Sequence, residues 1–445
     1  MQDPTSTPRQ ADAQDCDVLI IGGGPAGSTA GALLAQRGFK VTLLEKARHP
    51  RFHIGESLLP ANLPLLEKLG VADQVRAVGM EKWGAEFVSP WHQPDRQTVF
   101  FGDAWEKAQP YAYQVRRSEF DEILLRNAQA RGAQVLEGCQ ARDVQFEPGG
   151  RGAVVQGDSD DGGTFRWHAR MVIDASGRDT LLARKFDTKR RNPRHNSSAL
   201  YGHFTGAHRH PGRDAGNITI FWFAHGWFWL IPLADGCTSV GAVVWPYYLK
   251  TRDKPLKEFF LDTIALCPAL AERLQGAELV SPVEATGNFS YSSQQTHGPG
   301  YLLIGDAYAF IDPVFSSGVM LAMQGGFTAA DTVETCLREP ARAAAALRAF
   351  DRQVRHGPRE FSWFIYRITH PVMRDMLMAP SNVFRVKEAL LSMLAGDIYG
   401  QTPIWRSIRI LKGIFYMLSA ANLRRSWAAA RQRRYNITSD AASDA

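Results

Sequence analysis

The chain has 445 residues, of which 22% are charged, 45% hydrophobic and 11% aromatic. This composition excludes a disordered chain. The length predicts one large domain with an insertion, or two to three subdomains. Five scattered cysteines without a CxxC pair argue against a disulfide framework or a metal site, and they favour a reducing, cytoplasmic setting. The first residues lack the apolar core of a signal peptide, and no apolar run is long enough to span a membrane.

The net charge of +6 is concentrated at the end of the chain. Residues 401–445 contain eight Lys or Arg and two Asp, whereas the preceding residues are balanced. The basic character therefore belongs to a tail, and we expect no nucleic-acid partner.

The beginning of the chain predicts a βαβ unit that binds a dinucleotide. An apolar strand is expected at residues 17–21, a helix at 28–36 and a second strand at 41–44. Gly22 would make the tight turn, Gly24 would admit a pyrophosphate, and Gly27 would let the helix pack on the strand. The helix N-terminus offers free N–H groups to phosphates, and the acid at the end of the second strand suits ribose hydroxyls. The predicted contacts are Gly22, Gly24, Pro25, Ala26, Gly27, Glu45 and Lys46.

The remaining patterns predict an interrupted cofactor domain. Short alternating, aromatic-rich segments at 83–101 and 200–245 indicate antiparallel sheet, and residues 120–130 a helix. From residue 325 the chain is expected to be helical, with breaks at Pro340, Pro358, Pro371, Pro380 and Pro403. The predicted organisation is a flexible arm (1–14), a Rossmann-like α/β cofactor domain (15–195) with an inserted substrate-side segment (61–112), an antiparallel-sheet substrate domain (196–292), a return to the cofactor domain (293–338), a helical C-terminal region (339–435) and a flexible tail (436–445).

Two later strand ends identify the dinucleotide. Only one glycine fingerprint is present, so a separate nicotinamide fold is not expected. Asp306, after Gly305 at the end of an apolar strand, can hydrogen-bond a ribityl chain, which only a flavin has. Together with Asp174-Ala175-Ser176-Gly177, these features resemble the FAD-dependent monooxygenase superfamily, whose fold is of the glutathione-reductase type. The resemblance implies bound FAD and places Arg117 against it.

Four further motifs resemble the flavin-dependent halogenases. They are Gly55-Glu56-Ser57-Leu58-Leu59-Pro60, Lys82-Trp83-Gly84-Ala85, Trp227-Phe228-Trp229-Leu230-Ile231-Pro232 and Phe310-Ile311-Asp312-Pro313-Val314-Phe315-Ser316-Ser317-Gly318. The resemblance implies that Ser57 and Pro313 lie at the flavin. It also implies that Lys82 is the catalytic lysine on which hypohalous acid acts.

Each motif has a physical interpretation and a simpler structural one. Trp227 and Trp229 point the same way on a strand, so their indoles would stack. Together with Ile231 and Pro232 they would form a wall between flavin and substrate. The simpler interpretation is that the two tryptophans fill a core, as most such pairs do. The backbone N–H groups of Ser317 and Gly318 would bind halide. The simpler interpretation is that these small residues only begin a helix that packs on the cofactor. Lys82 would lose its charge readily in a dry site, whereas most lysines are solvated.

One departure from the family concerns the substrate. Tryptophan-acting members carry a glutamate two positions before the residue that matches Ser317, where this chain has Phe315. Its absence favours more reactive phenols or pyrroles and leaves no general base to name. His53, His92, His203 and His225 are expected to be structural. Gly79 replaces a family phenylalanine, so the loop before Lys82 can differ.

The predicted function is halogenation of an electron-rich aromatic in secondary metabolism. Reduced FAD would come from a separate flavin reductase, with chloride or bromide as co-substrate and a free or acyl-carrier-protein-bound aromatic as substrate. An FAD-dependent hydroxylase, a geranylgeranyl-type reductase and a flavoprotein without activity are the alternatives. Residues 404–434 form a basic amphipathic pattern, which predicts packing on the protein itself; contact with a carrier protein or a membrane is the less common outcome.

Overall fold

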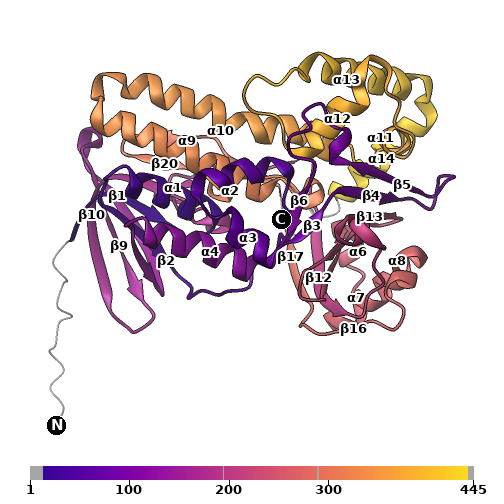
Figure 1. Cartoon of the computed structure of the whole chain (residues 1–445), viewed down its shortest axis with the longest axis horizontal. Helices are drawn as coiled ribbons and strands as arrows, with labels where there is room; N and C mark the ends of the chain where they lie inside the picture. Colours follow the sequence, from indigo (N-terminus) through magenta and orange to yellow (C-terminus); the bar gives the residue numbers. More distant parts are fainter. Residues whose placement is uncertain (1–13, 194, 288–289, 439–445) are drawn as a thin grey trace, which may run out of the picture.

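The computed structural model describes residues 14–193, 195–287 and 290–438 (Figure 1). The predicted arm lies outside the described residues except for Gln14, which begins the first strand. The predicted tail lies outside them from residue 439 on, whereas residues 436–438 end the last helix. Both predicted boundaries were therefore slightly wrong.

The first sheet is the cofactor-side layer, and its central strands are parallel. Its order is β19-β20-β10-β1-β2-β7, with β9 and β8 added antiparallel beside β10. Strand β1 pairs on one side with β10 and on the other with β2, so Val18 lies between Met171 and Val41. The continuous apolar run of β1 suits a strand buried on both faces. The strands are β1 (Gln14–Ile21), β2 (Val41–Glu45), β7 (Gln134–Glu137), β8 (Cys139–Phe146), β9 (Ala153–Ser159), β10 (Thr164–Asp174), β19 (His297–Gly298) and β20 (Tyr301–Leu303).

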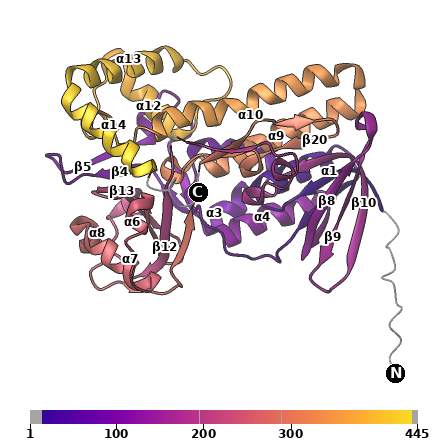
Figure 2. The same cartoon turned by 180° about the vertical axis from the view of Figure 1, so that it is seen from behind.

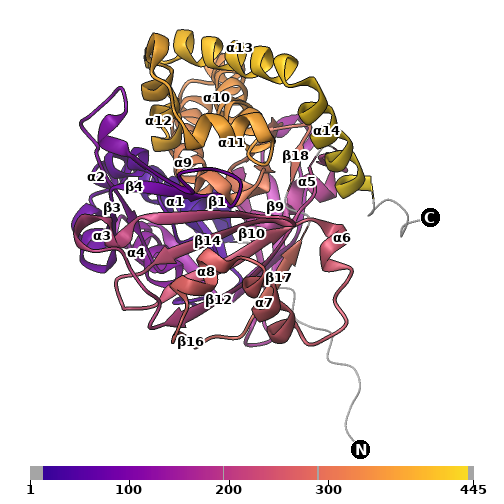
Figure 3. The same ribbon diagram turned by 90° about the vertical axis from the view of Figure 1, so that its right-hand side faces the viewer.

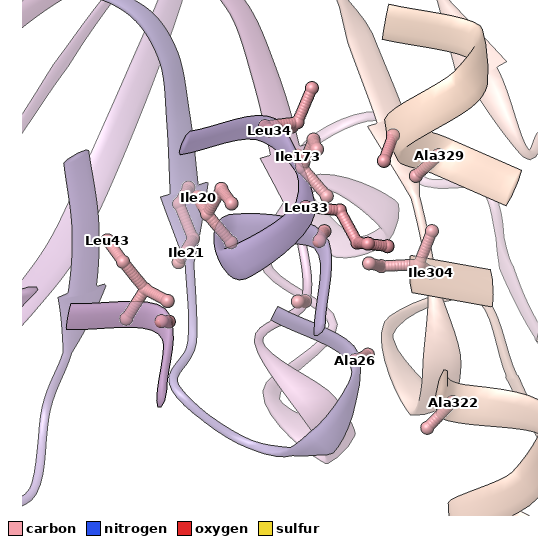
Figure 4. Close-up of a cluster of buried hydrophobic side chains, with 14 of the residues drawn as sticks. Ile20, Ile21, Ala26, Leu33, Leu34, Leu43, Ile173, Ile304, Ala322 and Ala329 are labelled. Atoms are coloured by element: carbon pink, nitrogen blue, oxygen red, sulfur yellow. The ribbon is translucent and has the colours of Figure 1, made fainter. Parts of the chain in front are cut away.

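Helices α1 (Pro25–Gln36) and α9 (Gly318–Arg338) pack together against this sheet. Figure 4 shows Ile20, Leu43 and Ile173 of the sheet in one cluster with Leu33 of α1 and Ala329 of α9. Small residues on α1 and α9 allow the two helices to approach closely. The packing fixes the start of α1 beside the start of α9.

The second sheet, which was predicted to form the substrate-side layer, is mostly antiparallel. Its order is β16-β12-β15-β14-β13-β4-β5, with β17 also paired to β12. Strands β4 and β5 come from the predicted inserted segment, and β4 pairs with β13 in parallel. The strands are β4 (Gly84–Val88), β5 (Arg96–Phe100), β12 (Ser198–Thr205), β13 (Ile218–Phe223), β14 (Gly226–Pro232), β15 (Thr238–Val244), β16 (Glu278–Leu279) and β17 (Glu284–Gly287).

Two small sheets join the layers. Strand β3 (Met80–Lys82) pairs with β6 (Ala112–Gln114), and β11 (Lys189–Arg191), β18 (Tyr291–Ser293) and β21 (Ala309–Phe310) form the other sheet. The helices before the C-terminal region are α2 (Leu63–Leu69), α3 (Ala72–Val78), α4 (Arg117–Ala130), α5 (Leu181–Lys185), α6 (Pro246–Leu249), α7 (Leu256–Ala265) and α8 (Pro268–Arg273).

The C-terminal region is helical and covers one side of both layers (Figure 2). Its helices are α10 (Ala343–Ile365), α11 (Pro371–Met378), α12 (Val386–Ala395), α13 (Trp405–Ala421) and α14 (Leu423–Thr438). The predicted break at Pro358 was wrong, because α10 continues through it. Proline removes one backbone hydrogen bond, but buried side chains on both sides of it, including Val354 and Phe361, hold the helix in place. Among the described residues, no helix combines the length and apolarity needed to cross a bilayer.

The inner face of α13 belongs to the core. Phe415 is 4% exposed and lies in the cluster that includes Phe361, whereas its neighbour Met417 is 64% exposed. We expect Phe415→Ala to lower the free energy of unfolding by about 3–5 kcal/mol, because it empties a packed site. Met417→Ala, the matched control, is expected to change it by less than about 0.5 kcal/mol. Denaturant unfolding would measure both, and equal effects would show that α13 is not part of the core.

Candidate active site

A cavity of about 790 Å³ lies between the two layers. Its wall combines the glycine turn after β1, the loop of residues 51–57, the inward face of β14 and the segment 304–319 that leads into α9. The volume suits a large organic ligand. The fold thus brings these four distant segments of the chain to one site.

The glycine turn has the geometry expected of a pyrophosphate site. Gly22 has a φ of 107°, and a Cβ on Gly27 would lie 1.9 Å from the Gly22 carbonyl oxygen, so only glycine fits there. Gly27 therefore packs behind the turn rather than lining the cavity. A Cβ on Gly24 would meet only Arg51, at 3.8 Å, which leaves space before the N-terminus of α1. Pro25 and Ala26 line the same space. This cradle fits the phosphates of FAD.

Glu45 lies at the end of β2, as predicted, but its carboxylate already has backbone partners. One oxygen accepts a hydrogen bond from the Gly23 N–H at 2.7 Å and the other from the Ala47 N–H at 2.9 Å. Each carboxylate oxygen can accept a further hydrogen bond, so room for a ribose hydroxyl remains. Lys46 lines the rim of the cavity and is ion-paired with Asp179.

Asp306 and Arg117 face the middle of the cavity. Burial raises the pKa of Asp306 to about 6, although Arg117 and Arg178 favour its charged form. The Arg117 guanidinium donates hydrogen bonds to Asp121 at 2.7 and 2.9 Å and to the Ile54 carbonyl at 3.1 Å, which fixes its direction. Gly305 lines the cavity beside Asp306. A carboxylate held at this depth suits the ribityl hydroxyls of FAD. By contrast, Asp174 of the family motif accepts backbone hydrogen bonds from Ser176 and Leu182, so its role is structural.

Three of the four residues predicted to form an aromatic wall lie at the cavity, although their geometry differs from the prediction. Trp227, Trp229 and Ile231 line the cavity, whereas Pro232 is not among the described lining residues, because alternate residues of a strand face opposite sides. The indoles are not stacked: their ring centroids lie 6.1 Å apart and their planes are tilted by 53°. Trp229 lies over Gly241 of the neighbouring strand, where a Cβ would be 2.1 Å from the indole, and its N–H donates to Ser239.

The segment before α9 forms part of the cavity wall. Pro313, Ser317 and Gly318 all line the cavity, and α9 begins at Gly318. A Cβ on Gly318 would meet nothing within 4 Å. The first N–H groups of a helix have no partner within that helix, and the helix dipole favours an anion there. This arrangement can hold a halide ion.

Lys82 is buried, with its side chain 2% exposed. Its ammonium donates hydrogen bonds to the Ser57 hydroxyl and the Leu58 carbonyl oxygen, both at 2.9 Å, and lies 5.2 Å from the centre of the Phe101 ring. Burial lowers the pKa of Lys82 to about 7. Lys82 is not among the described lining residues of the cavity, but Ser57 is, so the lysine lies directly behind the wall.

Several cavity residues were not predicted. Arg51 lies 3.6 Å from both Glu45 and Asp121, so its guanidinium stands beside the phosphate cradle. Glu56 lines the cavity and pairs with His203, whose Nε2 lies 3.0 Å from both carboxylate oxygens. Position 56 lies within a recognised motif, but His203 comes from the other sheet, and only the fold reveals the pair.

The four histidines that were expected to be structural have different surroundings. His92 contacts Ser89 and Asp375, and His225 contacts the Tyr247 hydroxyl, all away from the cavity. His53 lines the cavity, and burial lowers its pKa to about 4, so its ring is neutral at neutral pH. A neutral ring at this position can accept a hydrogen bond but carries no charge.

Comparisons with known proteins identify the family of the chain. The family model described as "FAD binding domain" matches residues 15–356. The chain is 36% identical to "Tryptophan 2-halogenase" of Chondromyces crocatus over 79% of this chain and 66% of that protein, and 29% identical to "1H-pyrrole-2-carbonyl-[peptidyl-carrier protein] chlorinase" of Pseudomonas fluorescens over 86% and 90%. The solved myxobacterial chondrochloren halogenase CndH superposes with a TM-score of 0.76 at 33% identity, covering 88% of this chain and 93% of that one.

The fold and the cradle define an FAD-dependent enzyme of the monooxygenase-like type. Within that class, the chain belongs to the flavin-dependent halogenases.

The buried lysine predicts a particular pH dependence of stability. Its pKa is about 7 in the folded protein and 10.5 in its ordinary state, so folding releases a proton between these pH values and stability rises with pH across this window. The variant Lys82→Met has no buried amine that must lose its proton on folding, so it lacks this cost in stability. We therefore expect Lys82→Met to be more stable than the native protein at pH 7, and the difference to shrink towards pH 10. Denaturant unfolding at several pH values would measure it.

Lys257→Met is the matched control, because Lys257 is exposed on α7. It should show no such pH-dependent difference. A Lys82→Met difference that stayed constant from pH 7 to 10 would contradict the lowered pKa.

Proposed function

We propose that this protein halogenates an electron-rich aromatic compound, phenolic or pyrrolic, and that Lys82 delivers the electrophilic halogen. The observation that carries the proposal is the position of Lys82: a buried amine with a pKa near neutrality, one hydroxyl group away from the cavity wall. FAD, when bound in its reduced form, would supply the two electrons that reduce dioxygen to the peroxide level, and oxygen at that level is the oxidant that converts halide to hypohalous acid.

The chain's own residues would position the reactants. The N–H groups at Ser317 and Gly318 would hold the halide, and Trp227 and Trp229 would keep an organic substrate away from the flavin side. At pH 7 Lys82 can be present as the ammonium, which hydrogen-bonds hypohalous acid, or as the amine, which can accept halogen. Ser57, which accepts a hydrogen bond from Lys82, connects the cavity with the lysine.

The class of substrate is inferred from Phe315. This side chain is buried in an apolar cluster with Ile311 and Val314, so no carboxylate stands there to receive the proton of the halogenated ring. A phenol or pyrrole needs less assistance of this kind. One relative is named for a pyrrole on a peptidyl carrier protein, which supports a carrier-bound aromatic as well as a free one.

The accessory components are part of the same proposal. The fold has one dinucleotide fingerprint, so reduced FAD would come from a separate flavin reductase. The five cysteines are free, which suits a reducing cytoplasm. Chloride and bromide are both candidate co-substrates.

The decisive experiment follows the halogen. The protein loaded with reduced FAD is mixed with oxygen, with or without bromide or chloride, in the presence of the hypohalite trap monochlorodimedone. We expect halide-dependent halogenation of the trap. An enzyme that ignored halide and instead hydroxylated an aromatic, or reduced an isoprenoid chain, would be the hydroxylase or geranylgeranyl-type reductase.

Lys82→Ala separates formation of the oxidant from its delivery. We expect halogenation of the trap to continue, but halogenation of a phenol or pyrrole to fall about a hundredfold. Lys257→Ala, which removes an exposed lysine, should change neither rate. If Lys82→Ala kept its activity on the aromatic, Lys82 would not be the catalytic residue.

Gly318→Ala tests the halide site. The added methyl group would meet no protein atom within 4 Å, and beside the Gly318 N–H it would take space that the halide needs. We expect the KM for halide to rise roughly tenfold, because displacing the ion would weaken one hydrogen bond to a charged group, with FAD affinity unchanged. The control is Gly413→Ala, which also meets no atom within 4 Å and lies on α13. An unchanged KM would place the halide elsewhere.

A further inference from the structure

The outward surface of α13 and α14 combines exposed apolar side chains with arginines. We call this surface the C-terminal basic face; it consists of Arg406, Arg409, Ile410, Met417, Leu418, Leu423, Arg424, Trp427 and Arg431, all of them exposed. Figure 3 shows the two helices as a yellow arc around the outside of the molecule. None of these residues lines the cavity, so the catalytic site does not explain them.

The apolar side chains gather where the two helices meet. Leu423 and Trp427 are each 67% exposed, and Met417 at the end of α13 is nearly as open. The inner side of α13 already gives Ile408, Leu411 and Phe415 to the core. Single exposed apolar residues are common, but a group of this size at one corner is typical of a contact surface.

The charges on this face differ from those that point inward. Lys412 pairs with Glu360 and Arg425 with Asp375, so carboxylates of the protein body neutralise these two cations. By contrast, Arg406, Arg409, Arg424 and Arg431 form no ion pair with any described carboxylate. Residues 398–438 contain no Asp or Glu at all. The face is therefore cationic without internal compensation.

A second apolar projection lies beside the start of α13. Val383 and Phe384 are exposed, and Phe384 and Arg385 have positive φ values of 55° and 58°, which are unfavourable for residues other than glycine. The Ser407 hydroxyl donates a hydrogen bond to the Phe384 carbonyl oxygen at 2.9 Å, which ties this loop to α13. Backbone strain in a loop that exposes a phenylalanine favours a role of this loop in binding another surface.

We propose that the C-terminal basic face binds the surface of an anionic lipid bilayer. Arginines without internal partners complement anionic headgroups, and Trp427, Leu423 and Met417 can enter the boundary between headgroups and acyl chains. The two helices form a convex arc (Figure 3). A convex surface can contact a deformable lipid bilayer, whereas a partner helix would need a groove on this protein. Binding of this kind is peripheral and would bring the enzyme to apolar aromatic compounds dissolved in the membrane.

The experiment is vesicle co-sedimentation of the full chain. Vesicles of phosphatidylcholine alone are compared with vesicles that contain phosphatidylserine, at low and high salt. We expect binding only with phosphatidylserine, and weaker binding at high salt because the charges are screened. Arg424→Glu and Arg431→Glu should each lower the affinity about fivefold or more. The double variant Trp427→Ser, Leu423→Ser should lower it at least as much.

A matched control keeps the test specific. Leu266 is about as exposed as these residues but lies at the end of α7, so Leu266→Ser should leave vesicle binding unchanged. The Tm and FAD content of each variant show whether it is folded.

The proposal is overturned if the intact protein binds no vesicle, if it binds neutral vesicles equally well, or if the variants bind as the native protein does. Retention of a purified acidic carrier protein by this face, without vesicle binding, would also overturn it in favour of a protein partner. None of these outcomes depends on halogenase activity.

Discussion

The proposed chemistry depends on keeping one amine away from water. Lys82 has two neutral hydrogen-bond acceptors and no carboxylate partner among the described residues, so desolvation is opposed only weakly. The pairing of β3 with β6, the loop that carries Ser57 and Leu58, and the Phe101 ring together enclose it. A lysine in such surroundings lowers the stability of the folded protein, and the large apolar clusters of the fold offset this loss. The same burial brings its pKa to neutrality, where both protonation states are available for chemistry.

Much of the cofactor side could be predicted from the sequence, because its signals are local. The turn at Gly22, Gly24 and Gly27, the acid Glu45 and the strand before Asp306 each combine a conformational requirement with a position along the chain. The substrate side was less predictable. Trp229 lies over Gly241 of the neighbouring strand, and the pairing of Glu56 with His203 joins the loop of residues 51–57 to β12. Such contacts arise between distant segments, and no periodicity reveals them.

The errors have physical causes of the same kind. Pro358 normally ends a helix, but apolar packing around α10 outweighs the lost hydrogen bond. The basic amphipathic pattern after residue 404 correctly indicated helix, but it did not show that the outward side of α13 carries exposed apolar side chains among its arginines. A sequence pattern averages over the circumference of a helix, whereas the fold decides which side faces the core. For this reason the outward surface of α13 and α14 became interpretable only in three dimensions.

The pairing of β4 with β13 has a consequence for how the molecule assembles. Residues 84–88 emerge early in synthesis, but their partner strand at 218–223 is made much later, and the start of α9 later still. Until then, the aromatic residues of β4 and β5 have no sheet to join and remain prone to wrong contacts. Folding dominated by such distant pairings is slow. The cavity wall extends to Tyr399, so it is complete only when about nine tenths of the chain has been made, and cofactor loading is expected to be a late event.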